Sequence, residues 1–257
     1  MAALVVGMAG PKRLEAFQRE TTNDPPCAEK AGVNCPHLGT PLFWASMPVR
    51  YFINSDSSGL SFNTVKGAVD PSFASWQSEG GISFEFGGQS QARADGQNGQ
   101  NTIFWRRFSN APNTFAQTIV TFFTETGEII DADTELNASF RWGVLPPGVD
   151  DPSNPVIDVQ SVVTHEAGHV FGLDHENTLG PQVVMFFSDT TGDSTRRMLT
   201  GDDVAGVRAI YSGDPEGGGG GGGGGCALVP SRGGGDLWPV AAVLALLAGR
   251  RRALRRA

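Results

Sequence analysis

Runs of apolar residues, some alternating with polar ones, predict β-strands through the middle of the chain. Residues 49–53 are rich in β-branched and aromatic side chains, and residues 82–86 alternate between apolar and polar. Polar residues 87–99, rich in Gly and Gln, predict a loop. Further strands are predicted at 102–108, at 118–123 and after the turn that opens residues 126–137.

Two segments show helical spacing instead. Residues 63–77 predict a helix whose Phe73 and Trp76 face the core. Asp70-Pro71 combines a good N-cap with a residue suited to the first helical turn. We therefore expect this helix to restart or kink at that point.

Asp158 is the expected N-cap of a second helix. The buried face of this helix is a series of valines at helical spacing: Val159, Val162, Val163 and Val170. Strands followed by a helix, with a mixed sheet, predict an α/β domain.

The composition fits a soluble extracellular protein. Hydrophobic residues make up 39% of the chain, enough for a core but low for a membrane protein. The formal net charge is −8, but residues 226–257 hold six Arg and one Asp, a net of +5, so the remainder carries −13. This acidic body argues against a nucleic-acid partner, which needs a basic footprint, and fits a protein that binds cations such as Ca²⁺.

The first 40 residues form an irregular lead-in. Residues 1–10 are small and apolar like the back half of a signal peptide, but they lack its positive start, so we expect a longer export signal. Cys27 and Cys35 are near neighbours that either close a small disulfide loop or remain two unpaired thiols. We favour the disulfide, because disulfides persist in exported proteins.

The chemistry of the chain centres on residues 165–175, which read H-E-A-G-H-V-F-G-L-D-H. Residues four apart share one face of a helix, so His165 and His169 can both reach one Zn²⁺ at roughly 2.0–2.1 Å. Glu166 lies about 100° further round the helix, where it is placed to take a proton from a water molecule at the metal.

Gly172 allows a sharp exit from this helix, because glycine adopts positive φ without steric cost. The turn then carries His175 back to the same metal. Three imidazoles and one water make an open, catalytic site, unlike the closed four-ligand site of a structural zinc. The motif uses three of the four histidines in the chain. The fourth, His37, is expected to be a surface residue.

This extended motif resembles that of the metzincin metallopeptidases. Metzincins have a methionine in a tight turn beneath the zinc, and Met185 stands at a suitable distance. Phe187 stands where astacin-like and serralysin-like members have a zinc-binding Tyr, and matrixins lack that Tyr. Residues 199–211 resemble the matrixin C-terminal helix, L-x-x-D-D-(I/V)-x-G-(I/V)-x-x-(I/L)-Y. The resemblance is strong over 159–211 and looser back to Trp44.

The resemblance implies a metzincin-like α/β (α+β) fold: a twisted, mixed five-stranded sheet with a zinc-site helix and a C-terminal helix. It implies a monomeric zinc endopeptidase that cleaves extracellular proteins, including those of the extracellular matrix. The implied site has His165, His169 and His175 as metal ligands, Glu166 as the catalytic residue, and Met185 and Gly172 as structural residues under the metal. The substrate peptide would lie extended beside an edge strand, with an S1′ pocket next to Met185 and the residues after it.

A second motif lies in residues 126–137, which resemble the G-x-I-x-D-A-D segment of bacterial matrixin-like proteins. Asp131 and Asp133 alternate onto one face of the predicted strand. They form either a calcium site or a solvated face, and we favour the solvated face.

The end of the chain, from residue 217 onwards, differs in composition from the rest. Residues 217–225 are an unbroken glycine run, which behaves as a flexible tether. Cys226, apolar residues 237–249 and the arginines within 250–256 follow. The apolar run is short for a membrane span of roughly 20 residues, and its basic end follows the positive-inside rule.

This tail resembles the MYXO-CTERM sorting tails of myxobacterial exported proteins. The resemblance implies processing near Cys226 and either surface attachment or release. The alternative is a weak membrane anchor. Both interpretations place the catalytic domain outside the cytoplasm, secreted or anchored at the cell surface, with the tail contacting the membrane or a sorting machinery.

We divide the chain into an export and lead-in segment (1–40), a catalytic domain (41–213), a Gly-rich linker (214–225) and the tail (226–257). The main functional alternative is a surface binding or adhesion module whose zinc site is structural or inactive. Glu166 separates the two hypotheses, because a structural metal site needs no carboxylate there. Metal-assisted hydrolysis of a non-peptide amide is disfavoured by the matrixin-like C-terminal helix.

Overall fold

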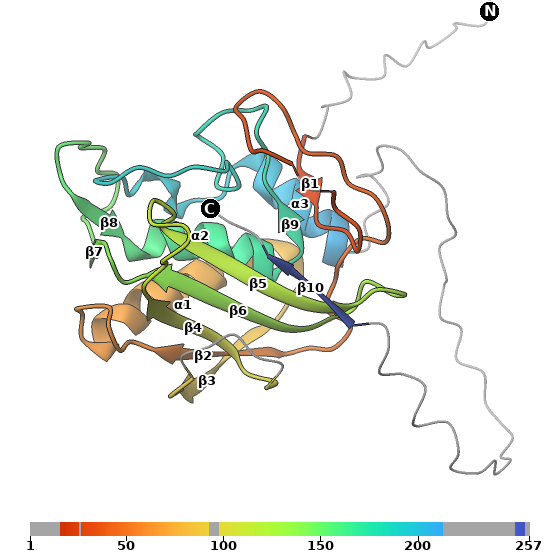
Figure 1. The fold of residues 1–257 in the computed structure, drawn as a ribbon, viewed down its shortest axis with the longest axis horizontal. Helices are drawn as coiled ribbons and strands as arrows, with labels where there is room; N and C mark the ends of the chain where they lie inside the picture. The colour runs from red at the N-terminus through yellow and green to blue at the C-terminus, as the bar shows by residue number, and fades with distance from the viewer. Residues whose placement is uncertain (1–15, 26, 93–97, 213–249, 255–257) are drawn as a thin grey trace, which may run out of the picture.

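A twisted sheet and a pair of helices form the two layers of the molecule (Figure 1). The computed structural model describes residues 16–25, 27–92 and 98–212, together with the backbone of 250–254. Helices α1 (Phe62–Gly80) and α2 (Val159–Val170) pack together across one face of the sheet. The apolar core lies between these layers. Within the described residues, no helix is both long and apolar enough to cross a membrane.

The body of the molecule has the expected five-stranded mixed sheet. Its strands are β2 (Val49–Asn54), β3 (Phe84–Gln89), β4 (Asn101–Arg106), β5 (Ala116–Phe123) and β6 (Ile129–Asn137). In the order β5-β6-β4-β2-β3, neighbouring strands are parallel except for β5, which runs antiparallel to β6. A sixth strand, β10 (Arg250–Leu254), pairs antiparallel with the outer edge of β5.

The strand predicted at 82–86 is displaced towards the C-terminus. Ile82 is buried in the core ahead of β3, and the strand continues through Gly87 and Gly88. A side chain at Gly87 would overlap the ring of Phe52 on β2, so glycine permits this close approach. The predicted loop therefore begins only after Gln89.

Helix α1 is a single helix, so the expected restart at Asp70-Pro71 is wrong, and the alternative of a kink there stays a prediction. The helix begins after Ser61, whose side chain accepts a hydrogen bond from Thr64 N, and it runs through Pro71 to Gly80. Phe73 stacks on Tyr51 of β2 with ring centroids 4.4 Å apart, so packing on the sheet spans the proline. Tertiary contacts of this kind override a local signal for a helix start.

Helix α2 begins where the sequence predicted. The Asp158 carboxylate accepts a hydrogen bond from Ser161 N, and the four predicted valines are buried. The C-terminal helix α3 (Gly201–Tyr211) begins with a capping box formed by Thr200 and Asp203. Asp203 also accepts hydrogen bonds from Val184 N and Met185 N, so this cap ties α3 to the methionine segment.

The lead-in is irregular, as predicted, but it packs closely on the body. Its short strand β1 (Gln18–Arg19) pairs antiparallel with β9 (Leu173–Asp174), just before the third histidine. The predicted disulfide between Cys27 and Cys35 is present, with an S–S distance of 2.07 Å. The remaining short elements are β7 (Arg141–Gly143), β8 (Val156–Asp158) and the 3₁₀ turn η1 (Thr195–Arg197).

Several predictions concern residues outside the described ranges. These are the export signal at 1–10, the glycine run at 217–225, Cys226, the apolar run at 237–249, and Arg255 and Arg256. The four-segment division of the chain likewise stays a prediction.

Candidate metal centre

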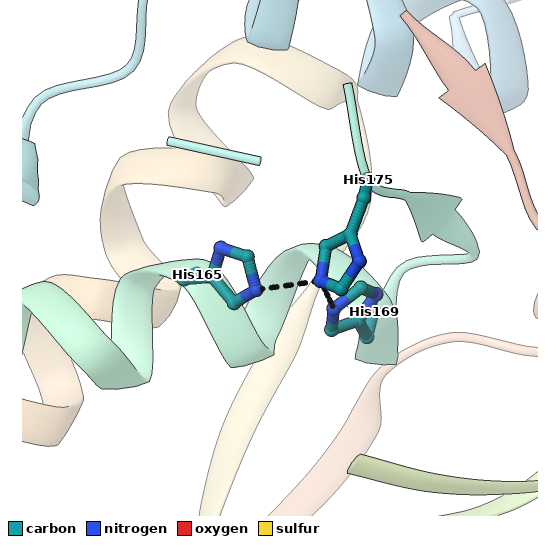
Figure 2. A group of neighbouring side chains, drawn as sticks. All are labelled: His165, His169 and His175. Atoms are coloured by element: carbon teal, nitrogen blue, oxygen red, sulfur yellow. Dashed lines mark hydrogen bonds between the residues drawn. The ribbon is translucent and has the colours of Figure 1, made fainter. Parts of the chain in front are cut away.

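Three imidazoles converge at the C-terminal half of α2 (Figure 2). His165 and His169 lie one turn apart on this helix, and His175 approaches from the segment that follows β9. His175 Nε2 lies 3.2 Å from His165 Nε2 and 3.1 Å from His169 Nε2. Nitrogens that share a tetrahedral zinc ion stand about 3.3 Å apart, so the three Nε2 atoms fit one metal.

The opposite nitrogen of each ring faces an acceptor. His165 Nδ1 lies 2.7 Å from the Val184 carbonyl oxygen, and His169 Nδ1 lies 2.9 Å from that of Leu173. His175 Nδ1 lies 3.3 Å from a carboxylate oxygen of Glu29. Acceptors at Nδ1 favour the tautomer with its hydrogen there, which leaves the Nε2 lone pairs directed at the shared point.

Glycine is required at the turn that brings in the third imidazole. Gly172 has φ of 92°, and a Cβ at this position would lie 2.8 Å from the Leu42 carbonyl oxygen. Gly168 faces the other way, where a Cβ would overlap the sulfur of Met185. Met185 is therefore packed directly under α2, and its carbonyl accepts a hydrogen bond from Glu176 N.

Glu166 is fully buried beside the histidines. Thr118 of β5 donates a hydrogen bond of 2.6 Å from its hydroxyl to Glu166 Oε2. Glu166 Oε1 has no hydrogen-bond partner among the described residues. Buried polar atoms are almost always bonded, so this oxygen is available to a group that the protein itself does not supply, such as a water molecule beside a metal.

Burial and neighbouring charges set the protonation of the cluster. Burial raises the pKa of Glu166 to about 7, against the opposing effects of His169 and Thr118. Burial lowers the pKa of His165 and lowers that of His175 to about 4, so both rings are neutral at pH 7. At His169 burial also disfavours the charged form, but the carboxylates of Glu20 and Glu166 outweigh it and raise the pKa to about 9.

These protonation states suit a divalent cation. His165 and His175 are in the neutral, metal-binding form at pH 7, whereas His169 holds a proton that a bound metal would displace, and the nearby carboxylates supply negative charge in a buried environment. Glu20 Oε1 lies 3.4 Å from His169 Nδ1, so a carboxylate stands behind this ring as well. The donor set therefore fits a zinc ion at the three Nε2 atoms.

A pocket opens beside His165. It is lined by Phe115, Val162, His165, Phe186, Ser188, Asp189 and Arg196. Arg196 is buried and donates to the carbonyls of Phe186 and Ser188, and it lies 2.7 Å from an oxygen of Asp189. The pocket is thus next to the residues that follow Met185, where the sequence placed a substrate subsite.

Two predictions about other polar residues are wrong. Asp131 and Asp133 do not form a solvated face, because both are buried on β6, and Asp133 accepts a hydrogen bond from Thr102 N. Alternation identifies residues on one face of a strand but not what covers that face. His37 is not a free surface residue, because its ring contacts Asp24 at 3.0 Å and Asp174 at 3.5 Å.

Sequence reasoning missed the residues that surround the histidines. Thr118 was predicted only as the start of a strand, and Glu20 and Glu29 only as parts of an irregular lead-in. No local pattern identifies them, because each meets its partner through tertiary packing. The disulfide was the available signal that the lead-in is an ordered part of the molecule.

A mixed sheet with a helix that carries H-E-x-x-H-x-x-G-x-x-H, a third histidine after a glycine turn and a buried methionine defines a metzincin-type metallopeptidase. The family model of matrixin matches residues 43–212. The chain belongs to the matrixin family. Membership of this family implies a zinc-dependent metallopeptidase.

Several individual proteins are similar to this chain. The metalloendoproteinase 5-MMP of Arabidopsis thaliana is 36% identical over 66 residues, 26% of this chain and 18% of the plant protein. Matrix metalloproteinase-C of Caenorhabditis elegans is 25% identical over 211 residues, 79% of this chain and 33% of the nematode protein. Human matrilysin is 26% identical over 215 residues, 80% of this chain and 71% of matrilysin. The chain thus spans well under half the length of the first two relatives.

Proposed function

We propose that this protein is a zinc-dependent endopeptidase that cleaves extracellular proteins, with His165, His169 and His175 as the metal ligands. The convergence of the three Nε2 atoms, with that of His175 within 3.2 Å of each of the other two, is the observation that carries this proposal. A zinc ion bound there supplies a Lewis acid, which lowers the pKa of water towards about 7 and polarises a peptide carbonyl. Membership of the matrixin family supports the same conclusion.

Glu166 is the proposed general base and acid. Its free oxygen accepts the proton of the attacking water, while Thr118 holds the other oxygen. The protonated carboxyl group then delivers that proton to the nitrogen of the leaving amine as the C–N bond breaks. Burial raises the pKa of Glu166 in the metal-free site, and a pKa raised towards the working pH lets a carboxyl group both accept and release a proton.

The substrate is proposed to lie extended along the outer edge of β5. Antiparallel pairing with this edge provides backbone hydrogen bonds that do not depend on the substrate sequence. The pairing of β10 with residues 119–123 supports the proposal, because this edge already accepts an extended strand. The pocket beside His165, which has room for about one water molecule, would have to widen to receive the side chain that follows the cleaved bond.

The proposed location is the cell exterior, either as a secreted or a surface-anchored bacterial protein. The Cys27–Cys35 disulfide supports an oxidising compartment. A MYXO-CTERM-type tail would attach the catalytic domain to the surface or release it after processing. Calcium binding at Asp131 and Asp133 stays a prediction.

Proteolysis of denatured casein and gelatin by the full chain tests this function. We expect cleavage that a zinc chelator abolishes and that added zinc restores, with no cleavage by His175→Ala. A protein that binds zinc through the three histidines but cleaves neither substrate would favour the alternative of a surface binding or adhesion module. Glu166 argues against that module, because a structural zinc site has no use for a buried carboxyl group with a free oxygen.

A further inference from the structure

The loop closed by the Cys27–Cys35 disulfide is docked on the segment that follows the third histidine. Gly32 N donates a hydrogen bond of 2.6 Å to the Asn177 carbonyl oxygen, and Asn177 N donates one of 2.7 Å to Asn34 Oδ1. Asn34 Nδ2 in turn donates to Glu176 Oε2 at 2.7 Å. Contacts to two consecutive residues fix the loop against the metal centre.

Glu29 projects from this loop to His175. One of its carboxylate oxygens accepts a hydrogen bond of 2.6 Å from Asn177 Nδ2, and the other lies 3.3 Å from His175 Nδ1. His175 is 3% exposed, so water has little access to this nitrogen. His175 Nδ1 makes no hydrogen bond among the described residues, and the Glu29 carboxylate at 3.3 Å is the charged acceptor that faces it.

The other two imidazoles are held differently. The main-chain carbonyls of Val184 and Leu173 are the closest acceptors to Nδ1 of His165 and of His169, and Glu20 stands further back at 3.4 Å from His169 Nδ1. His175 instead depends on a side chain that lies 146 positions earlier in the sequence. The third ligand is thus the one at which a side chain of the N-terminal segment takes the place of a main-chain carbonyl.

We propose that Glu29 is a positioning residue for the third metal ligand, and that the Cys27–Cys35 loop is a built-in part of the metal centre. This inference rests on the proposed zinc site at the three histidines. A carboxylate at Nδ1 fixes the tautomer that presents Nε2 to the metal, orients the ring and makes it a stronger donor. The disulfide contributes by limiting the positions that the Glu29 side chain can take.

Zinc affinity measured by chelator competition in the full chain tests the proposal. We expect Glu29→Ala to raise the zinc Kd by about 10- to 100-fold, the usual effect of losing such a partner. Glu29→Gln keeps an acceptor oxygen without the charge, so its Kd should lie between those of the parent and Glu29→Ala. Glu85→Ala is the matched control, because Glu85 pairs with Arg50 on the exposed far edge of the sheet.

The disulfide is tested with Cys27→Ser/Cys35→Ser. Introduced into the parent, this double substitution is expected to raise the zinc Kd. Introduced into Glu29→Ala, it should raise the Kd little further, because both changes act through the same contact. Cobalt substitution gives an independent readout. The visible absorption bands of the bound Co²⁺ should shift in Glu29→Ala and stay unchanged in Glu85→Ala, which a general loss of stability would not produce.

A Glu29→Ala variant with the parent's Kd and cobalt spectrum would overturn the proposal, while zinc binding and cleavage by the parent would leave the proposed function intact. A parent chain that binds no zinc would overturn both. If Glu29→Ala loses its native circular dichroism, Glu29→Gln decides the question. A folded Glu29→Gln variant whose zinc Kd equals that of the parent refutes the role of Glu29.

Discussion

At the residue scale, Glu166, the proposed catalytic residue, is a buried carboxyl group beside the three histidines. Thr118 holds one oxygen at 2.6 Å, and the other has no hydrogen-bond partner among the described residues. One oxygen is thereby fixed while the other stays available for proton exchange. The motif predicted Glu166, but Thr118 lies 48 residues earlier, where only the folded sheet brings it to the helix.

Removing the Thr118 hydroxyl tests its role directly. Thr118→Val keeps the shape of the side chain but leaves Glu166 without its hydrogen-bond donor, so the carboxyl group is less well positioned. We expect kcat/KM to fall by about 10- to 100-fold, with little change in zinc affinity. Thr121→Val, on the opposite face of β5, should cleave as the parent does. An unchanged kcat/KM in Thr118→Val would contradict the assignment.

The raised pKa of Glu166 predicts a pH effect on the metal-free protein. Its pKa moves from 4.5 to about 7 on folding, so the folded state holds this proton more tightly than the unfolded state. The resulting stabilisation is fully present below pH 4.5 and is lost as the pH rises through 7. Glu166→Gln mimics the neutral form at every pH, so the difference from the parent reports the titration of Glu166 together with its effect on His169, whose pKa the carboxylate helps to raise.

The free energy of unfolding of the parent, relative to Glu166→Gln, should therefore decline by a few kcal/mol, in order of magnitude, between about pH 4.5 and pH 7. Urea unfolding of both chelator-treated proteins across this range measures it. A difference in the free energy of unfolding that stays constant or increases with pH would show that folding does not raise the pKa of Glu166.

At the scale of elements, the sequence predicted what local patterns determine. The valines and the Asp158 cap of α2 are as expected, because helical spacing and capping act within a few residues. The unbroken α1 and the burial of Asp131 were not predictable, because both depend on contacts across the sheet. The docking of the lead-in is still less predictable, since its partners lie more than a hundred residues away.

Asp158 links the start of α2 to the rest of the molecule. Besides capping the helix it accepts a hydrogen bond from Leu145 N and pairs with the Arg197 guanidinium at 2.5 Å. Asp158→Ala is expected to destabilise the protein by about 2–4 kcal/mol, because the cap is lost and a mostly buried Arg is left unpaired. Asp158→Asn retains the cap, so its loss should be smaller. Denaturant unfolding would contradict this account if both variants matched the parent.

At the scale of the whole molecule, the candidate metal centre is assembled from α2, the turn that follows it, and a lead-in more than a hundred residues earlier in the sequence. Helix α2 supplies two imidazoles, the turn after Gly172 supplies the third, and the lead-in supplies Glu20 and Glu29 behind the rings. The motif alone identified the three histidines. The carboxylates behind them appear only in the folded molecule, which explains why sequence analysis treated the lead-in as peripheral.

Zinc should stabilise this assembly, because it binds the folded protein far better than the unfolded chain. At about 100 times its Kd, zinc is expected to add about 2.7 kcal/mol to the free energy of unfolding. Thermal unfolding with and without zinc measures the effect as a rise in Tm. His175→Ala should show a much smaller rise, and an equal rise in that variant would place the zinc elsewhere.

The most direct test of the central claim compares the parent with Glu166→Gln at equal zinc content. The variant keeps the metal ligands and an acceptor for Thr118, and it removes only the group that exchanges the proton. We predict that kcat/KM on an internally quenched peptide falls by about 10²- to 10⁴-fold, the usual contribution of a general base. Comparable cleavage by the two proteins would contradict a peptidase mechanism built on Glu166.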